Sequence, residues 1–356
     1  MKVLLISRGD LVHLRPFMDY MQARDWEVHL AELSPTTFDA GDVTRHNCYL
    51  DDGYPKLLNY FYAGRMVRRL CRELKPDLLW GHYVTSAGTV AWLSGVRPYV
   101  LTVHGSDVLY ESKKWTIRQL LKRMFRHAAL IHTVSPQIDD RIVELGTSRD
   151  KLSCLAFGIE ADAIEFTPRD SELHRTLRLA CTRSLQNFIY DIPTLIRAMG
   201  ELKQRNVEAQ LTLCGTGALE PEFRAMVAEL GVEETVTFGG GFRPNELNDI
   251  LREHDVYVSA SISDGASLSL LEAMASGIFP VVSDIESNRV WLDEKRARLF
   301  PTGDHVALAD CIEELAGQSR LPTDGRDNRE LIEEKADRPK NMNQVLDELE
   351  KVVKRS

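Results

Sequence analysis

Two carboxylates stand on either side of a run of small residues in the stretch SISDGASLSLLEAMASG, which covers residues 261–277. Asp264 comes before the predicted helix of residues 268–276, and Glu272 lies within its apolar run. An acid in an apolar environment costs free energy unless a partner offsets that cost. A purely structural role therefore explains Glu272 poorly, and the pattern favours a bound ligand.

The start of this predicted helix has the properties of an anion site. The backbone N–H groups of a first helical turn, here around Ser267, Leu268 and Ser269, have no intrahelical partners and lie at the positive end of the helix dipole. Carboxylates accept hydrogen bonds from vicinal hydroxyls such as those of ribose. An anion pocket flanked by two such acids suits a nucleoside diphosphate sugar. In the alternative interpretation, Asp264 caps the helix and Glu272 is solvated.

Other polar residues and glycines directly follow predicted strands. Ligands of open parallel sheets bind beyond the carboxyl ends of the strands, so these positions are candidates for a site. They are Asp10, His104, Asp107, Arg183, Gly215 and Gly217. Each is weak evidence alone, because a single histidine is commonly structural, Arg183 could pair with a surface acid, and G-x-G without a third glycine is no dinucleotide fingerprint.

The elements that would position these residues alternate between strand and helix. Predicted strands cover residues 2–7, 26–33, 76–82, 97–107, 129–135, 177–184, 209–217, 234–240, 254–261 and 277–284. Predicted helices cover residues 14–23, 65–74, 192–206, 220–230, 243–253 and 268–276. This alternation is typical of doubly wound α/β domains. Because the pattern lapses around residues 155–175, we expect two such domains facing across a cleft.

Composition limits the class of protein. The 356 residues are 44% hydrophobic and 27% charged, which is typical of a globular protein with more than one domain. The net charge of −9 argues against non-specific binding of nucleic acid. Six scattered cysteines without C-x-x-C spacing favour reduced core residues over a zinc site or disulfides. With no apolar run of bilayer length, we expect a cytoplasmic protein.

A basic stretch runs against the acidic balance. Residues 112–138 contain no Asp or Glu, while six basic side chains lie among large apolar ones. The pattern predicts a basic amphipathic helix. Two interpretations remain open: a solvated helix face, or contact with an anionic membrane surface through basic residues and outward-facing Trp115 and Phe125. The basic residues are Lys113, Lys114, Arg118, Lys122, Arg123 and Arg126.

The carboxylate stretch resembles the donor-site motif of retaining family 4 glycosyltransferases (glycosyl transferases group 1), which have the GT-B fold. In that motif two acids separated by seven residues are followed by EAMA-x-G-x-P-V-V. Asp264 stands where the first acid is usually Glu, and EAMASGIFPVVSD begins with Glu272 as the second. The segments TVHGSD, TVSP and LCGTGALEPEFRAMVAELGVEETVTFGG are similar to further parts of the family in the same order.

This resemblance implies two Rossmann-like domains. We expect an acceptor-side domain at residues 1–165, a donor-binding domain at residues 166–334, and a last helix at residues 335–356 that packs back on the first domain. The expected activity is transfer of a sugar, with retention, from a nucleoside diphosphate sugar to an acceptor hydroxyl. The acceptor would be a glycan or lipid-linked glycan in cell-surface polysaccharide or glycolipid biosynthesis, and the enzyme would lie in the cytoplasm or peripherally on the inner face of the membrane.

The resemblance also implies residue roles. Glu272 would bind the ribose, and Asp264 the transferred sugar. His104 would lie near the reacting centre, and Arg183 would neutralise the departing diphosphate. The backbone at Ser267, Leu268 and Ser269 would contact the sugar and diphosphate, with Gly215 also at the donor site. Neither a cofactor nor a metal is expected, since no D-x-D pair accompanies the motif.

The chain departs from the family at one position that bears on catalysis. Relatives usually have a lysine about five residues after this arginine, where this chain has Phe188. Losing a cation there weakens stabilisation of the leaving group. Two alternatives to an active transferase therefore stay open: a low-turnover sugar-nucleotide binding subunit, or a GT-B sugar-nucleotide epimerase.

Overall fold

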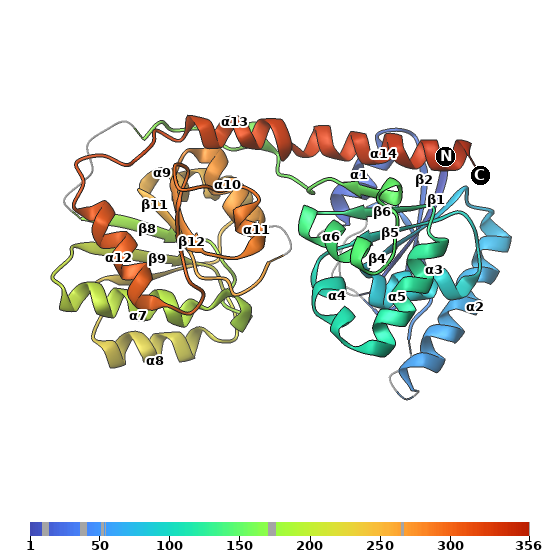
Figure 1. The fold of residues 1–356 in the computed structure, drawn as a ribbon, viewed down its shortest axis with the longest axis horizontal. Coiled ribbons are helices and arrows are strands. Elements are labelled where there is room, and N and C mark those ends of the chain that lie inside the picture. The colour runs from blue at the N-terminus through green and yellow to red at the C-terminus, as the bar shows by residue number, and fades with distance from the viewer. Residues whose placement is uncertain are drawn as a thin grey trace. The chain divides into compact units, whose positions relative to one another are not determined.

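The chain folds into two compact units. The computed structural model describes residues 1–8, 14–35, 41–50, 53, 55–169, 176–264 and 267–355 (Figure 1). The N-terminal unit comprises Met1–Phe157 with Pro339–Ser356, and the C-terminal unit comprises Gly158–Arg338. The division lies within the polar stretch at residues 155–175, several residues before the boundary expected at residue 165.

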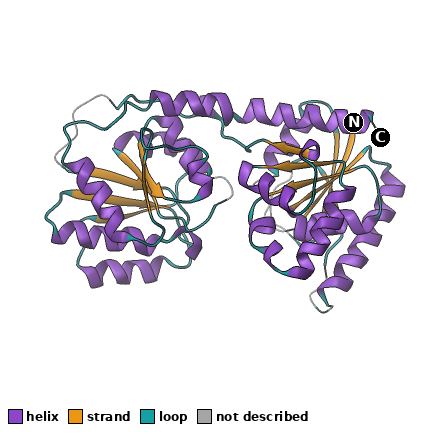
Figure 2. Ribbon diagram, in the orientation of Figure 1, coloured by secondary structure: helices purple, strands orange, loops and turns teal. Residues whose placement is uncertain are grey.

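The N-terminal unit is built on a seven-stranded parallel sheet of order β3-β2-β1-β4-β5-β6-β7. Figure 2 shows the strands of both units in orange with helices around them. The strands of the N-terminal unit are β1 Lys2–Ser7, β2 Glu27–Glu32, β3 Thr44–Asn47, β4 Leu78–His82, β5 Tyr99–Val103, β6 Leu130–Thr133 and β7 Leu152–Cys154. Its helices are α1 Arg15–Gln22, α2 Lys56–Leu74, α3 Thr89–Ser94, α4 Ser106–Leu109, α5 Trp115–His127 and α6 Pro136–Glu144, with α14 Arg338–Lys354 at the end of the chain.

The last helix completes the core of this unit. Met342, Val345, Leu346 and Leu349 of α14 recur at the three- and four-residue spacing that forms one apolar stripe of a helix. They are buried in one cluster with residues of α1 and of the central strands, including Phe17, Leu5 and Trp80. Helix α14 therefore covers the same face of the sheet as α1.

The C-terminal unit is built on a six-stranded parallel sheet of order β10-β9-β8-β11-β12-β13. Its strands are β8 Leu177–Cys181, β9 Ala209–Cys214, β10 Val236–Gly240, β11 Val256–Ser259, β12 Phe279–Ser283 and β13 Arg298–Phe300. Its helices are α7 Ile192–Gln204, α8 Glu220–Leu230, α9 Leu247–Glu253, α10 Leu268–Ser276, α11 Glu286–Arg289, α12 His305–Ala316 and α13 Arg326–Lys335. Apolar strand residues and the inner faces of α7, α8 and α12 form its core.

The predicted fold class of two Rossmann-like doubly wound domains is confirmed. The sequence pattern missed β3, β7 and β13, which have only three or four residues and no long apolar run. Among the described helices, none has the length and apolar character needed to cross a bilayer.

The basic stretch at residues 112–138 is not one helix. Helix α5 covers only Trp115–His127, and strand β6 and the Pro136 start of α6 follow it. Trp115 is 70% exposed, as the membrane interpretation requires, but Phe125 is fully buried. The expectation that Phe125 faces outward is therefore wrong, because Phe125 lies on the same buried side of the helix as Leu121 and Met124.

Candidate functional site

The candidate site lies at the carboxyl ends of β8, β9 and β11 in the C-terminal unit. From β8 the chain continues to β9 and β10 on one side and then returns to β11 on the other, so the strand order reverses at β8. Ligands of doubly wound sheets bind beyond the strand ends at such a reversal. Arg183, Gly215 and Asp264 each follow one of these strands.

Arg183 is the centre of the site. Its side chain is almost completely buried, with 8% of the residue exposed. One terminal nitrogen, Nη1, donates to Ser269 Oγ at 2.9 Å and to Ser267 Oγ at 3.2 Å. The other, Nη2, donates to Ser261 Oγ at 3.1 Å and forms an ion pair with Asp264 Oδ2.

These contacts use all four N–H bonds of the two terminal nitrogens of Arg183. The fifth donor, Nε, is buried and has no hydrogen-bond partner among the described residues. Tyr190 covers the guanidinium, with its ring centroid 4.1 Å away. Burial opposes the positive charge, but Tyr257 and Asp264 more than offset this, so the pKa of Arg183 is raised. The guanidinium is therefore rigidly held, and a new acceptor at either terminal nitrogen must displace an existing one.

Asp264 faces this cation. Its side chain is 18% exposed, and its Oδ2 is the ion-pair partner of Arg183. Its Oδ1 accepts no hydrogen bond from the described residues. Asp264 can therefore accept a bond from a ligand hydroxyl while it stays paired with the arginine. The adjoining residues 265–266 lie outside the described part of the chain.

The anion-site segment forms the start of α10 as predicted. Ser267 is the N-cap, and its Oγ accepts from Leu270 N at 3.3 Å. Ser269 Oγ also accepts a hydrogen bond from the hydroxyl of Tyr257 at 2.8 Å. The two serine side chains thus bind the arginine and the helix start to each other, and the backbone N–H groups at Leu268 and Ser269 lie in the first turn.

Glu272 is the one partly exposed residue between Ser269 and Ser276 in this otherwise buried helix. Its carboxylate has no hydrogen bond or ion pair with the described residues. Burial raises the pKa of Glu272 to about 7, although the charges of Arg338 and Arg183 oppose the shift. The protein therefore supplies long-range positive charge but no direct donor, which leaves the carboxylate available to ligand hydroxyls.

Glu272→Gln is expected to stabilise the fold at pH 8 and to have no such effect at pH 5. The pKa of Glu272 is raised from 4.5 to about 7 on folding, so ionisation penalises the folded state as the pH rises through that range. The expected gain at pH 8 is about 1–3 kcal/mol. Denaturant unfolding at both pH values measures it, with Glu229→Gln at an exposed position of α8 as the control. A gain of equal size at pH 5 and pH 8 would contradict the explanation.

Close packing between the loops after β8 and β9 explains why CGTG has glycine at both positions, Gly215 and Gly217. A Cβ on Gly215 would lie 2.3 Å from the carbonyl oxygen of Arg183, and one on Gly217 would lie 2.0 Å from the carbonyl carbon of Leu185. The two loops are also hydrogen-bonded, since Leu185 N donates to Thr216 O at 3.0 Å. Gly215 thus allows the loop after β9 to support the backbone that carries Arg183.

Gly215→Ala is expected to destabilise the protein by about 1–3 kcal/mol, because the added methyl group must push the Arg183 backbone away. Gly200→Ala is a suitable control: Gly200 lies within α7, and a Cβ there would make an ordinary contact with Leu230 at 3.6 Å. Chemical unfolding of both variants compares them. Equal stability of the two variants would show that the loops adjust without cost.

His104 lies in the N-terminal unit, directly after β5. Its ring stacks on Tyr83 with 3.8 Å between centroids and an interplanar angle of 7°. Asp107 is buried beside it and accepts from Val84 N at 2.9 Å and Gly105 N at 3.0 Å. Burial raises the pKa of Asp107 to about 6. Asp107 therefore holds the loop backbone, and His104 is the group of this pair whose ring could face a ligand.

Some site residues were not predicted and others are not described. No sequence pattern assigned a role to Ser261, Tyr190 or Tyr257, and only their contacts with Arg183 or Ser269 identify them. Tyr257 lies within β11, and the apolar pattern of that strand indicates only a core residue. Phe188, which replaces the expected lysine, is 63% exposed and begins the short 3₁₀ turn Phe188–Tyr190. Asp10 lies outside the described residues.

Comparison with protein families identifies both halves of the chain. Residues 176–318 match the family model described as glycosyl transferases group 1, and residues 2–135 match the model described as glycosyl transferase 4-like. The chain belongs to the group 1 glycosyltransferases. The predicted family is thereby confirmed.

Two characterised relatives match most of this chain. The amylovoran biosynthesis glycosyltransferase AmsK of Erwinia amylovora is 28% identical over 73% of this chain and 60% of its own length. The D-inositol 3-phosphate glycosyltransferase of Nocardia farcinica is 27% identical over 72% of this chain and 62% of its own length. The chain thus spans about three fifths of each of these relatives.

Solved structures show the same fold. Sucrose-phosphate synthase from Thermosynechococcus elongatus aligns over 100% of both chains, with a TM-score of 0.79 and 18% identity. HepE from Anabaena, in complex with UDP and glucose, aligns over 99% of this chain and 100% of its own, with a TM-score of 0.77 and 15% identity. The fold of the chain is therefore that of GT-B glycosyltransferases.

Proposed function

We propose that this protein transfers a sugar, with retention of configuration, from a nucleoside diphosphate sugar to an acceptor hydroxyl. The observation that carries this proposal is the buried Arg183 at the start of α10, with the carboxylates of Asp264 and Glu272 beside it. The cation and the helix start suit a diphosphate, and the two acids suit sugar hydroxyls. The acceptor proposed is a glycan or lipid-linked glycan of cell-surface polysaccharide or glycolipid biosynthesis.

The relatives support this choice. AmsK is named for amylovoran biosynthesis, and HepE was solved with UDP and glucose. UDP is therefore a reasonable first probe for this chain. Three of the four proteins compared above are named as glycosyltransferases or as a sucrose-phosphate synthase, which does not favour a binding subunit or an epimerase.

The proposed residue roles follow the geometry. Glu272 accepts hydrogen bonds from the ribose, and the backbone at Leu268 and Ser269 binds the diphosphate. Asp264 accepts from a hydroxyl of the transferred sugar through its open Oδ1. For His104, a role near the donor sugar rests on the family resemblance alone. Gly215 lies at the donor site, where its lack of a side chain lets it support the loop of Arg183.

Charge develops on the diphosphate as the sugar leaves, so stabilising that charge is the main electrostatic task of the site. Arg183 is the cation at hand, but its terminal nitrogens are fully engaged by Asp264 and three serines. A phosphate oxygen that binds a terminal nitrogen must therefore replace one of these acceptors. We propose that it replaces Asp264 Oδ2, so that the arginine is drawn to the diphosphate as its charge grows.

Product analysis separates the three candidate functions. The purified protein is incubated with a panel of nucleotide sugars, chosen first by the rise in melting temperature that each produces, with and without an acceptor glycan. Nucleoside diphosphate released only with acceptor, together with an α-linked product from an α-linked donor, supports a retaining transferase. Epimerised donor sugar, or stabilisation without any product, supports one of the alternatives.

Arg183→Ala is expected to lower kcat by about 100-fold or more and to change the donor KM much less, because the arginine acts mainly on charge that develops in the transition state. The substitution also leaves Asp264 without its cation, so Arg183→Lys, which keeps the charge, is measured beside it. Melting temperatures show whether each variant is folded. A folded Arg183→Ala variant with wild-type turnover would place leaving-group stabilisation elsewhere.

Metal independence is a further expectation of this proposal. Leaving-group stabilisation is assigned to Arg183 and the first turn of α10, which leaves no step for a divalent ion. Turnover should therefore be unchanged after dialysis against a chelator. Loss of turnover in the chelator, with recovery on addition of magnesium or manganese, would contradict this part of the proposal.

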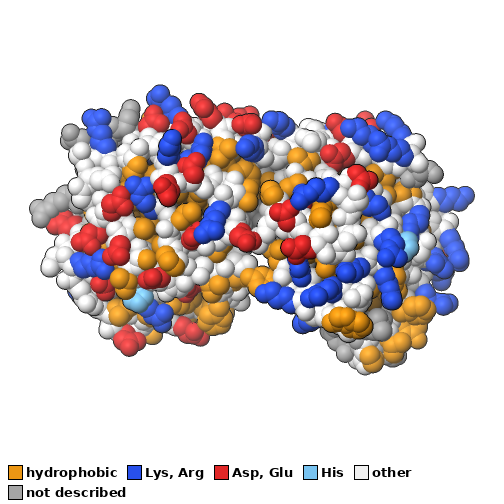
Figure 3. All heavy atoms as spheres, viewed as in Figure 1, with side chains coloured by type: hydrophobic (Ala, Val, Ile, Leu, Met, Phe, Trp, Pro, Cys, Tyr) orange, Lys and Arg blue, Asp and Glu red, His pale blue; other side chains and the backbone are white. Residues whose placement is uncertain are grey.

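We also propose that the N-terminal unit rests on an anionic membrane surface, at the inner face of the membrane. Two exposed features support this. Helix α5 and the turn before it carry Lys113 and Arg123 beside Trp115, which is 70% exposed. Helix α2 exposes Leu58, Phe61, Tyr62 and Met66, and the hydrophobic patch over its lower turns is visible in Figure 3.

The charge of α2 favours a lipid surface over another apolar protein face. Arg65 and Arg69 lie on the exposed side with the apolar residues, and Arg65 lies 5.9 Å from the ring centroid of Phe61. The only acid of this helix, Glu73, is paired with Arg69. Helix α3 packs between α2 and α5 and contacts both, so the two features belong to one layer of helices. Apolar rings with basic neighbours are typical of interfacial helices.

The protein is therefore expected to sediment with vesicles of phosphatidylcholine and phosphatidylserine at low ionic strength and to be released by high salt. Changing Lys113, Lys114 and Arg123 together to Glu should abolish sedimentation. The control changes Lys295, Arg320 and Arg243 of the C-terminal unit to Glu, which alters net charge equally. Wild-type protein that stays in solution at low salt, or equal losses in both variants, would contradict a membrane-facing N-terminal unit.

A further inference from the structure

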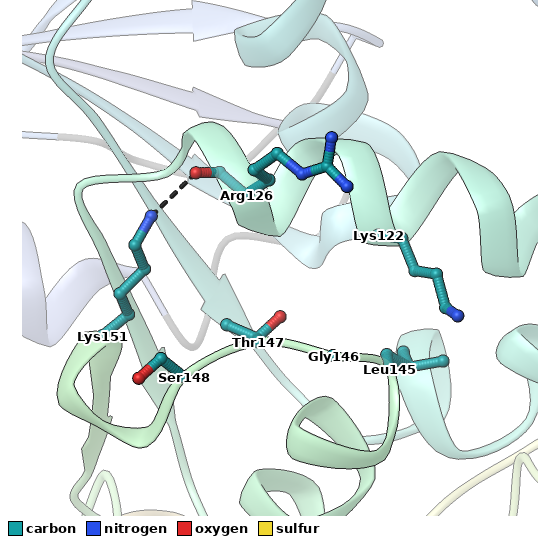
Figure 4. Close-up of a pocket in the computed structure, with 7 residues that line it drawn as sticks. All are labelled: Lys122, Arg126, Leu145, Gly146, Thr147, Ser148 and Lys151. Carbon is teal, nitrogen blue, oxygen red and sulfur yellow. Dashed lines mark hydrogen bonds between the residues drawn. The ribbon is translucent and has the colours of Figure 1, made fainter.

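A pocket of about 340 Å³ in the N-terminal unit lies between α5 and the loop that follows α6 (Figure 4). Lys122 and Arg126 of α5 line one side. The loop Leu145–Ser148 lines the other, and Lys151 lies at one end. The proposed donor site is in the C-terminal unit, so this pocket is separate from it. Its volume is large enough for a phosphate group with several waters.

Three cations line the pocket, and none of them forms an ion pair with a described carboxylate. Lys122 and Arg126 are four residues apart on α5 and therefore one above the other on the helix surface. Like charges at this spacing destabilise a helix. A bound anion would remove that penalty, whereas the protein supplies no counter-charge of its own here.

Lys151 is held in place from the opposite side. Its ammonium donates to the carbonyl oxygen of Arg126 at 2.7 Å and to that of Ala128 at 3.1 Å. It thus binds the negative end of α5, which is a favourable position for a cation. An ammonium has three donors, so one N–H remains for a ligand. This cation is therefore positioned before any ligand binds.

The acidic side chains of the surrounding segments form ion pairs with arginines or accept hydrogen bonds from hydroxyls. Glu144 pairs with Arg141 and Asp140 with Arg149. Asp150 accepts from the hydroxyl of Ser148. Asp139 is buried and accepts a hydrogen bond from the hydroxyl of Thr133. The sequence next to the pocket, residues 112–138, contains no acid at all. The residues that line the pocket thus include three cationic side chains and no carboxylate.

The loop supplies small groups that admit an anion. Gly146 has a φ of +91°, and a Cβ there would meet nothing within 4 Å, so the surface above it is open. Thr147 is buried except for a small exposed part, and its side chain points toward α5 in Figure 4. The lining thus includes one hydroxyl and three cations, which are the donor groups typical of a phosphate site.

We propose that this pocket binds a phosphate group, held by Lys122, Arg126 and Lys151 with the Thr147 hydroxyl. The ligand class is a phosphate monoester or free phosphate. A phosphorylated lipid headgroup and a soluble phosphate would present the same chemistry to the pocket. The inference does not depend on sugar transfer, because it concerns other residues in the other unit.

The pocket variant for the test is Lys122→Ala with Arg126→Ala. Neither side chain has a hydrogen bond or ion pair with a described residue, so their loss should not unfold the chain. The matched control is Lys295→Ala with Arg320→Ala, which removes two charges from exposed positions of the C-terminal unit and touches neither the pocket nor the proposed membrane-facing surface. Lys151 is left unchanged because it also caps α5.

Two probes distinguish the sources of the phosphate. Inorganic phosphate is titrated calorimetrically against chloride at constant ionic strength, and vesicles of phosphatidylcholine with phosphatidic acid are compared with phosphatidylcholine alone. Binding of either probe to the wild type and to the control, weakened about tenfold or more in the pocket variant, supports the site. Phosphate alone identifies a soluble ligand, and phosphatidic acid a headgroup. If neither probe binds the wild type more tightly than the pocket variant, the proposal is wrong.

Discussion

The ion pair between Arg183 and Asp264 is the interaction on which the candidate site depends. A buried guanidinium is costly to desolvate, and the carboxylate together with three serine hydroxyls offsets that cost. The same contacts hold the loop after β8, the loop after β11 and the start of α10 together. Structure and function therefore share one cluster, in which the cation proposed to stabilise a departing diphosphate also fixes the site that receives it.

The rest of the C-terminal unit serves this cluster. The reversal of strand order at β8 brings the ends of β8 and β11 together, and the glycines after β9 allow a close backbone approach behind Arg183. Glu272 differs from Asp264, which is paired with Arg183. The carboxylate of Glu272 is partly buried without a direct partner, and its pKa is raised to about 7. Burying a carboxylate without a partner costs free energy. Functional sites commonly carry such a cost, and hydrogen bonds from ligand hydroxyls can offset it.

Local sequence patterns predicted the bounds of α10, whereas the partners of Arg183 depend on contacts between distant segments of the chain. Helix α10 has the predicted bounds because Ser267 caps its start and Gly277, in the left-handed conformation, ends it. The partners of Arg183 could not be predicted, since Ser261 lies 78 residues away in the chain and no short-range pattern records the contact. The orientation of Phe125, by contrast, could have been predicted locally, since Leu121, Met124 and Phe125 stand at the three- and four-residue spacing of one helix face and all three are buried.

The central claim is that Arg183 is exchanged between Asp264 and a diphosphate, and the affinity of Asp264→Asn for UDP tests it most directly. The asparagine still accepts a hydrogen bond but carries no charge, so it competes less well for the arginine and no longer repels the phosphates. Calorimetry should therefore show tighter binding of UDP to this variant than to the wild type, while sugar transfer falls. Weaker or unchanged UDP binding by a folded Asp264→Asn variant would contradict the exchange.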